Sequence, residues 1–337
     1  MNILVLRALQ LGDLLCAVPA LRALDAAFPR ARITLVGLPW ARKFASRFER
    51  YVDRFIEFPG FPGMRERALD LEALPAFFYL TRYSQFDLAL QMHGSGEITN
   101  PLAILLGARR IAGYYRPGRF CPDPGRFLEW RDEEHEVLRW LRLAEHVGAP
   151  AQGTHLEFPL HAADLEEAAS FALGSYAILH PGSQLASRRW PAQRFAEVGD
   201  ALAAAGMQIV LTGSAAEAIL TRCVKDTMRK PALDLAGRTS LGGLAALVAR
   251  ARVVVSNDTS VSHIAAATRT PSVIVACGSA PRRWAPLNRR LHRVLHREVP
   301  CRPCAHGECP LAGHPCALGV GAAEVINEAL KAYACAA

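Results

Sequence analysis

The chain has 337 residues, of which 51% are hydrophobic and 21% charged, and its formal net charge is +8. These proportions exclude a disordered chain, and the length suits two α/β domains with a core each. Residues 1–160 hold 20 Lys/Arg and 18 Asp/Glu, a net of +2, whereas residues 161–337 hold 19 and 13, a net of +6. The basic second half favours a polyanionic ligand, such as a nucleotide diphosphate, a phosphorylated lipid or a nucleic acid, although a solvated arginine-rich face has the same composition.

The first residues and the cysteines indicate the cellular compartment of the protein. Residues 1–6 lack the charged, apolar and cleavage segments of a signal peptide, and no run of about 18 uncharged apolar residues occurs anywhere. We therefore expect a cytoplasmic protein, with peripheral contact at the inner membrane as an open alternative. In that reducing compartment the scattered members of the nine cysteines are expected to be buried thiols.

Predicted strands and helices alternate along the first half. Strands are predicted at residues 3–6, 32–36, 86–91 and 109–113, and helices at 13–28, 40–50, 98–106 and 134–147. Such alternation is typical of a parallel, Rossmann-like sheet. The following segment, residues 148–153, is the best linker candidate because it is rich in Gly, Ala and Pro.

The same rhythm restarts in the second half. Strands are predicted at residues 176–180, 208–212, 233–235, 253–256 and 272–276, and helices at 192–205, 215–227, 241–249, 261–268 and 322–333. We therefore predict an α/β protein with two Rossmann-like domains, residues 1–152 and 153–337, on either side of a central cleft. A single large sheet is the alternative, but it needs an unusual number of strands.

The loop after the first predicted strand carries a carboxylate at the start of a helix. Asp13 follows Leu11-Gly12 there. One interpretation is that Asp13 caps the N–H groups of the helix. The other is that it is a general base that takes a proton from an attacking hydroxyl. Spacing alone does not separate the two.

Three strand ends in the second half suit a phosphate ligand. His180-Pro181-Gly182-Ser183 is followed by Arg188 and Arg189 just before a helix, where cations and N–H groups bind anions. Ser214 and Glu217, after Thr212, fit a capping box, and Glu217 could instead bind ribose hydroxyls. Asp258-Thr259-Ser260 opens a helix whose first N–H groups suit a pyrophosphate. His263 in that helix is interpreted as structural.

Four further segments have open interpretations. Residues 282–302 hold seven arginines, which face either an anionic ligand or solvent. Cys301, Cys304, Cys309 and Cys316 begin with a C-x-x-C pair, which is compatible with a structural metal knuckle, with reduced thiols or with disulfides. Segments 55–64 and 74–80 are apolar and aromatic, and either pack in the core or touch a membrane surface.

Taken together, these motifs resemble those of the heptosyltransferases, glycosyltransferase family nine, over nearly the whole length. The opening motif is Ile3-Leu4-Val5-Leu6-Arg7, Leu11-Gly12-Asp13 and Pro19-Ala20-Leu21-Arg22-Ala23-Leu24. The others are His180-Pro181-Gly182-Ser183 with Arg189-Trp190-Pro191, Ser256-Asn257-Asp258-Thr259-Ser260-Val261-Ser262-His263, and Cys301-Arg302-Pro303-Cys304. The resemblance implies a GT-B fold and inverting sugar transfer with neither a catalytic metal nor a cofactor.

The resemblance also implies roles for individual residues. Asp13 becomes the general base, and Arg188, in place of the family lysine, neutralises the diphosphate of an ADP-sugar. The expected donor site comprises Gly12, Ser183, Arg188, Thr212, Ser214, Glu217, Asp258, Thr259 and Ser260. Ser260 stands where the family has glycine, and would be strained if a positive φ were required.

The acceptor implied by the family is a lipopolysaccharide core, for which we nominate Arg65, Arg67, Arg116 and Arg119 in the first domain. An alternative is a heptosyltransferase that modifies a protein of the autotransporter type. From other classes, a nucleic-acid-binding protein and a non-catalytic sugar-nucleotide-binding protein remain. We expect no nucleic-acid partner, because basic residues and aromatics are not interleaved.

Overall fold

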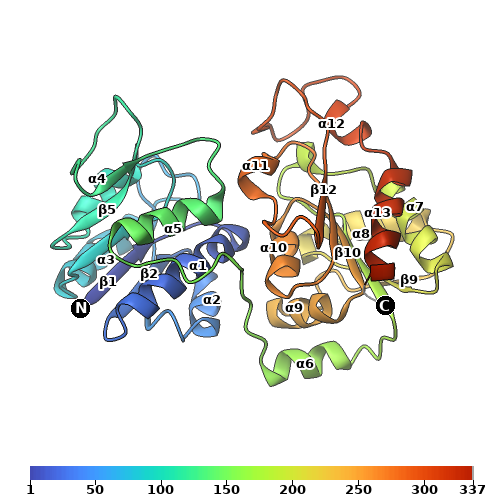
Figure 1. Cartoon of the computed structure of the whole chain (residues 1–337), viewed down its shortest axis with the longest axis horizontal. Coiled ribbons are helices and arrows are strands. Elements are labelled where there is room, and N and C mark those ends of the chain that lie inside the picture. The colour runs from blue at the N-terminus through green and yellow to red at the C-terminus, as the bar shows by residue number, and fades with distance from the viewer. Residues whose placement is uncertain (336–337) are drawn as a thin grey trace. The chain divides into compact units, whose positions relative to one another are not determined.

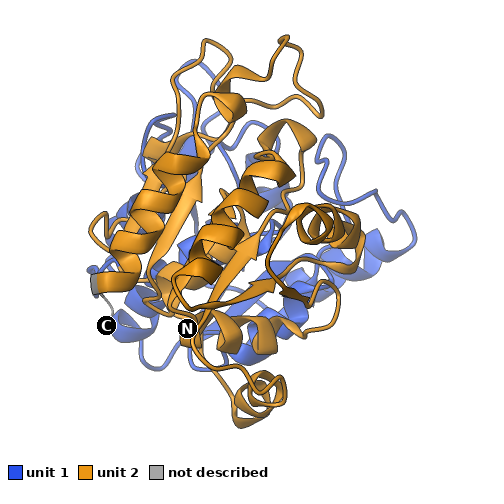
Figure 2. Ribbon diagram, turned by 90° about the vertical axis from the view of Figure 1, so that its right-hand side faces the viewer, with its two compact units in different colours: residues 1–154 blue, residues 155–337 orange. Residues whose placement is uncertain are grey.

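The structure, a computed structural model, describes residues 1–335, which form two compact units (Figure 1). Unit 1 spans residues 1–154 and unit 2 spans residues 155–337 (Figure 2). Each unit holds one six-stranded sheet in which every pairing is parallel, so the alternative of a single large sheet is wrong.

Unit 1 has the strand order β3-β2-β1-β4-β5-β6. Its strands are β1 (Asn2–Leu6), β2 (Arg32–Gly37), β3 (Arg54–Glu57), β4 (Leu88–Gln91), β5 (Ile111–Tyr115) and β6 (Phe127–Glu129). Its helices are α1 (Leu11–Ala27), α2 (Ala41–Arg47), α3 (Ala73–Tyr83), α4 (Thr99–Leu105) and α5 (Glu136–His146). Helices α1 and α5 pack side by side (Figure 1).

Unit 2 has the order β12-β11-β10-β7-β8-β9. Its strands are β7 (Tyr176–His180), β8 (Gln208–Leu211), β9 (Ala232–Asp234), β10 (Val253–Asn257), β11 (Ser272–Val275) and β12 (His292–Leu295). Its α-helices are α6 (Ala162–Ala169), α7 (Ala192–Ala204), α8 (Ala218–Thr227), α9 (Leu241–Arg250), α10 (Ser260–Ala267), α11 (Pro281–Trp284), α12 (Pro315–Leu318) and α13 (Ala322–Cys335). Two 3₁₀ turns, η1 (Ala186–Arg188) and η2 (Ala215–Glu217), precede α7 and α8.

Both units share one topology, in which the first strand lies centrally. The next two strands are added on one side of it and the last three on the other side. The switch falls between β1 and β4 in unit 1 and between β7 and β10 in unit 2. In open parallel sheets, ligands bind at such a switch point, beyond the carboxyl ends of the strands. The loops after β1 and β4, and after β7 and β10, are therefore where chemistry is expected.

The central strands are buried along their whole length, as sheets covered on both faces require. All five residues of β7 and of β10 are buried, which explains their apolar composition. Trp190 packs edge-on against Phe195 of α7, with ring centroids 5.0 Å apart. Both residues belong to the main core cluster of unit 2, where α7 and α13 pack together. This core fixes the strand ends that carry the polar loops.

The apolar segments of unit 1 divide between core and surface. Phe58 and Phe77 are buried in the core, whereas Tyr79 and Tyr83 on α3 are 70% and 74% exposed and stack on each other at 5.8 Å. The core-packing interpretation of segments 55–64 and 74–80 therefore holds for Phe58 and Phe77, and contact with a membrane surface stays a prediction. Within residues 1–335, no helix is both long and apolar enough to cross a membrane.

Candidate active site

Asp13 lies in the first turn of α1, just beyond the carboxyl end of β1, and Gly12 precedes it in the same turn. Its Oδ2 accepts the Gln10 N–H at 3.2 Å as one half of a capping box. Its side chain is still 22% exposed. The carboxylate thus caps the helix and also reaches solvent at the switch point of unit 1, so the two interpretations of Asp13 are compatible.

The buried side chain of Arg7 holds this turn in place. Its side chain is fully buried, and its guanidinium donates to the carbonyl oxygens of Asp13 at 2.8 Å and Met92 at 2.6 Å. It also lies 3.3 Å from Glu136 Oε1 and 4.5 Å from the centre of the Trp140 ring. The pairing compensates a buried charge that would otherwise be costly. The loop after β1 is thereby tied to β4 and α5.

His93, after β4, faces the same loop. The Ala8 N–H donates to His93 Nδ1 at 3.2 Å, so in the neutral ring the proton is on Nε2, which lies 3.4 Å from Glu66 Oε1. That hydrogen bond lowers the pKa of Glu66. Our sequence analysis missed both residues, although His93-Gly94-Ser95 follows a predicted strand in the manner of His180-Pro181-Gly182-Ser183.

The four nominated acceptor arginines all follow carboxyl ends of strands in unit 1. Arg67 pairs with Glu57 at 2.9 Å, Arg116 with Asp132 at 2.8 Å, and Arg119 with Glu97 at 3.3 Å. Arg65 is exposed and adjoins Glu66, the partner of His93. The segment around Arg65 therefore reaches the end of β4, at the same sheet edge as Asp13.

In unit 2 the turns after β7 and β8 are joined by side chains. His180 Nδ1 lies 3.0 Å from Thr212 Oγ1, and burial lowers the pKa of His180, against a weaker opposing effect of Glu217. Glu217 Oε2 accepts the N–H and the hydroxyl of Ser214, both at 2.8 Å, which completes the capping box. A Cβ on Gly182 would come within 2.1 Å of Glu217 Oε1, so glycine here lets the carboxylate keep this position.

Asn257 at the end of β10 holds the neighbouring turn in place. The buried amide accepts the Trp190 N–H at 2.9 Å and donates to Pro181 O at 2.8 Å. Thr259 is extended (φ −151°) and Ser260 is the first helical residue of α10. Ser260 is not among the residues with positive φ, so the condition under which strain is expected at this position is not met.

The first turn of α10 presents backbone N–H groups of the kind that the predicted phosphate site needs. The N–H groups of Ser260 and Val261 begin the helix, where it supplies no acceptor for them. His263, one turn on, is buried, and its ring meets Trp284 edge-on with centroids 6.3 Å apart. This packing favours the structural interpretation of His263.

Arg188 is held by the cysteine-rich segment. Its Nη2 and Nε donate to the Cys304 carbonyl at 2.6 and 3.2 Å, and Cys304 N donates to Gly278 O at 2.7 Å, beyond β11. Ser187 donates its hydroxyl to His306 O at 2.6 Å. Arg189 donates to the carbonyl of the buried Ser183 at 2.9 Å. Segment 301–307 therefore positions the loop that carries Arg188.

The thiols of that segment are not joined by disulfides. Cys301, Cys304, Cys309 and Cys316 each carry a free thiol, and burial raises the pKa of Cys316. Within residues 1–335, no group of three or more His, Cys, Asp or Glu side chains is arranged to hold a metal ion. The disulfide interpretation of the four cysteines is therefore not supported, and a role in binding a structural metal stays a prediction.

The arginines of residues 282–302 are partly internal. Arg302 donates to the carbonyls of Ala276 and Cys277 at 3.0 and 2.8 Å, and Arg297 pairs with Glu324. Beside Arg302, the buried hydroxyl of Ser279 has no partner within residues 1–335. Ser279 was missed by sequence analysis, although Gly278-Ser279 repeats the Gly-Ser that follows β7 and β8.

Comparison with known proteins decides the family. The family model for glycosyltransferase family 9 (heptosyltransferase) matches residues 80–314, more than half of the chain. The chain belongs to glycosyltransferase family 9. It is therefore a glycosyltransferase, as the motifs predicted.

Relatives and solved structures of the family match along the whole chain. Lipopolysaccharide heptosyltransferase 2 of Escherichia coli K12 is 24% identical over 97% of both chains. A family 9 glycosyltransferase from Veillonella parvula superposes with a TM-score of 0.79 at 21% identity, over 99% of this chain and 97% of that one. E. coli ADP-heptose LPS heptosyltransferase II gives 0.78 at 21% identity over 99% of both. The predicted GT-B fold class is confirmed.

Proposed function

We propose that this family 9 glycosyltransferase transfers a heptose, or a related sugar, from an ADP-sugar to a lipopolysaccharide core acceptor. The observation that carries the proposal is Asp13, a carboxylate fixed by Arg7 at the switch point of unit 1 yet partly exposed. The names of the E. coli relatives support heptose as the sugar, ADP as the nucleotide of the donor and lipopolysaccharide as the acceptor. We assign the acceptor to unit 1 and the donor to unit 2.

In the proposed reaction Asp13 takes the proton of the acceptor hydroxyl. The hydroxyl oxygen forms a bond to the anomeric carbon while the bond from that carbon to the diphosphate breaks, which inverts the configuration. A positioned base of this kind contributes about 10²–10⁴-fold. Arg7 lies close to the Asp13 carboxylate and donates a hydrogen bond to the Asp13 backbone carbonyl. These contacts keep the carboxylate in place whether or not it is protonated.

The donor diphosphate gains negative charge as it leaves. Arg188 and the first N–H groups of α10, next to Asp258, Thr259 and Ser260, supply positive charge for it. The Gly-Ser turns at Ser183 and Ser214 lie at the same sheet edge and contact the phosphates and sugar in this proposal. Glu217 Oε1, over Gly182, is assigned to the ribose.

The acceptor carries anionic groups in this proposal, and the arginines at the carboxyl edge of unit 1 bind them. Arg65 is the leading candidate for binding the acceptor because its segment adjoins His93. Each of the other three, Arg67, Arg116 and Arg119, would leave its carboxylate partner to bind an anionic group of the acceptor. The exposed pair Tyr79 and Tyr83 on α3 is proposed to contact the membrane in which a lipid-linked acceptor resides.

A donor and acceptor panel tests the proposal. ADP-, UDP-, GDP- and CDP-sugars are compared by thermal shift, where a ligand at 100 times its Kd adds about 2.7 kcal/mol of stability. ADP release and product mass are then measured with lipopolysaccharide lacking heptose and with an autotransporter protein. Stabilisation by ADP-heptose and heptose addition to the lipopolysaccharide support the proposal. Addition to the protein alone, or binding without transfer, overturns it.

A further inference from the structure

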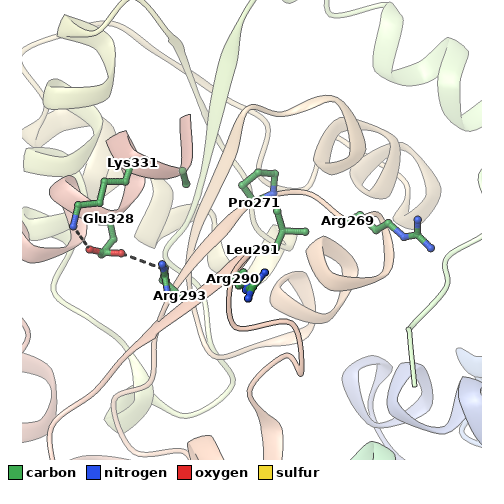
Figure 3. Close-up of a pocket in the computed structure, with 8 residues that line it drawn as sticks. Arg269, Pro271, Arg290, Leu291, Arg293, Glu328 and Lys331 are labelled. Carbon is green, nitrogen blue, oxygen red and sulfur yellow. Dashed lines mark hydrogen bonds and ion pairs between the residues drawn. The ribbon is translucent and has the colours of Figure 1, made fainter. Parts of the chain in front are cut away.

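A hollow lies at the amino ends of strands in the unit 2 sheet, away from the proposed donor turns. It has a volume of about 320 Å³ and opens where β11 and β12 begin, since Pro271 directly precedes β11 and Leu291 directly precedes β12. Helix α13 closes one side with Glu328 and Lys331 (Figure 3). The proposed donor turns follow the carboxyl ends of β7, β8 and β10 in the same sheet, so the hollow is separate from them.

The walls carry excess positive charge. Glu328 is already shared between Arg293 at 3.3 Å and Lys331 at 2.8 Å, as the dashed lines of Figure 3 show. Arg269 and Arg290 also line the hollow, and neither guanidinium has a hydrogen-bond or carboxylate partner within residues 1–335. Four cations against one carboxylate leave a formal excess of +3, which favours an anion carrying more than one charge.

Arg269 occupies a backbone position that favours glycine. It follows Thr268, the C-cap of α10, with φ +58°, in the left-handed region, which glycine adopts without the penalty that a side chain incurs. Gln85, Ala172 and His314 also have positive φ, so this backbone position alone assigns no role to the Arg269 side chain. In the loop before β12, Asn288 Oδ1 accepts the N–H groups of Arg290 and Leu291 at 3.2 Å each, which orders the backbone of Arg290.

We propose that this hollow binds a small soluble organic phosphate. A guanidinium presents a planar fork of donors that matches phosphate oxygens, and Arg290 supplies such a fork, whereas the side chain of Arg269 points away from Arg290 (Figure 3). Pro271, Leu291 and Ala332 give an apolar surface between the charges, which suits the ring-sized body of a phosphomonoester. A volume of this size is at the lower end for small-molecule sites, so the ligand is compact. The proposal is independent of the sugar-transfer function.

The test measures binding of phenyl phosphate to the full chain by calorimetry, with saturating ADP present to fill a donor site. Wild type is expected to bind phenyl phosphate more tightly than inorganic phosphate, because only the former contacts Pro271 and Leu291. Arg290→Gln is expected to weaken binding by about tenfold, since one charged hydrogen bond is worth roughly that factor. Arg222→Gln, an exposed arginine on α8 in the same unit, is the charge-matched control and should bind as wild type.

Arg269→Gly is a second control, because the Arg269 side chain points away from Arg290 (Figure 3). Glycine relieves the left-handed backbone, so Tm should stay equal or rise, and phenyl phosphate should bind as in wild type. The proposal is overturned if phenyl phosphate does not bind, if Arg290→Gln binds it like wild type, or if Arg222→Gln loses as much. Binding of wild type to phosphatidic acid vesicles without binding of phenyl phosphate would also overturn it, in favour of a lipid headgroup.

Discussion

The guanidinium of Arg7 donates to the backbone carbonyl of Asp13 over 2.8 Å and lies 3.9 Å from its Oδ1. One buried cation thus fixes both the main chain and the charge of the proposed base. It reaches across the switch point as well, to Met92 and to Glu136 on α5. The geometry of the proposed base and the stability of unit 1 therefore depend on the same side chain.

Replacing Arg7 should destabilise the protein strongly. Arg7→Met removes one of the two cations beside the buried Glu136 carboxylate, the other being Arg139 at 3.7 Å, and breaking a buried pair costs about 3–5 kcal/mol. Arg7→Met with Glu136→Gln should recover little of that loss, because the buried Arg139 then loses its carboxylate partner. The measurement is the free energy of unfolding in urea, with the exposed Arg110→Met as control. An Arg7→Met loss below about 1 kcal/mol would contradict the assigned network.

A side chain at Gly182 should move the Glu217 carboxylate. A Cβ there would lie 2.1 Å from Glu217 Oε1, so Gly182→Ala must displace the carboxylate that caps η2. We expect a lower Tm and weaker ADP-sugar binding by at least about tenfold, the worth of one charged hydrogen bond. Gly321→Ala is the control, since a Cβ there meets nothing within 4 Å. Equal ADP-sugar affinity in Gly182→Ala and Gly321→Ala would remove Glu217 from the donor site.

Arg188 should matter for turnover more than for donor affinity. Arg188→Gln removes positive charge from the leaving diphosphate, and losing one such stabilising group costs about 10²–10³-fold in kcat. Arg188→Lys should retain part of the activity because it keeps the charge but loses the fork geometry. Steady-state ADP release gives kcat and KM, with the exposed Arg282→Gln as control. Unchanged kcat in Arg188→Gln would rule out this role.

Buried histidines should make the protein acid-sensitive. Burial lowers the pKa of His292 to about 4, so folded His292 is neutral where the unfolded chain, with a pKa near 6.5, takes up a proton. Stability should therefore fall as the pH falls from about 6.5 to 4, by at most about 3 kcal/mol from this group. His180, with a pKa lowered in the same direction, adds to the effect.

Unfolding in urea at several pH values checks this sensitivity. His292→Gln should flatten the dependence between pH 6.5 and 4 in part, and His146→Gln, on the surface of α5, should leave it as in wild type. A wild-type stability that is constant over this range would contradict the assigned burial of His292.

The alternation of apolar strands and helices was sufficient to predict both Rossmann-like units. Strands such as β7 and β10 are buried throughout and therefore read as continuous apolar runs. Edge elements escaped prediction because their sequences are mixed. Strand β12 contains His292 and Arg293 within a stretch that we interpreted as basic surface, and β3 begins with an exposed arginine. Their pairing with a neighbouring strand decides their structure, and the local sequence does not show it.

The sequence likewise predicted only part of the candidate site. The turns with Asp13, Ser183, Ser214 and Asp258 were found because glycine and serine follow an apolar run. His93 and Glu66 were missed because they meet only in space, 27 positions apart along the chain, at 3.4 Å. The function of the Cys304 segment was missed because it acts through a backbone carbonyl, which any residue carries.

The central claim is that Asp13 is the base of sugar transfer. Its most direct test is the turnover of Asp13→Asn with ADP-heptose and heptose-free lipopolysaccharide, beside Asp25→Asn on the same helix. Asparagine keeps the capping oxygen, so we expect an unchanged Tm and donor Kd but a kcat at least about 100-fold lower, while Asp25→Asn turns over as wild type. Wild-type turnover by folded Asp13→Asn would contradict the account.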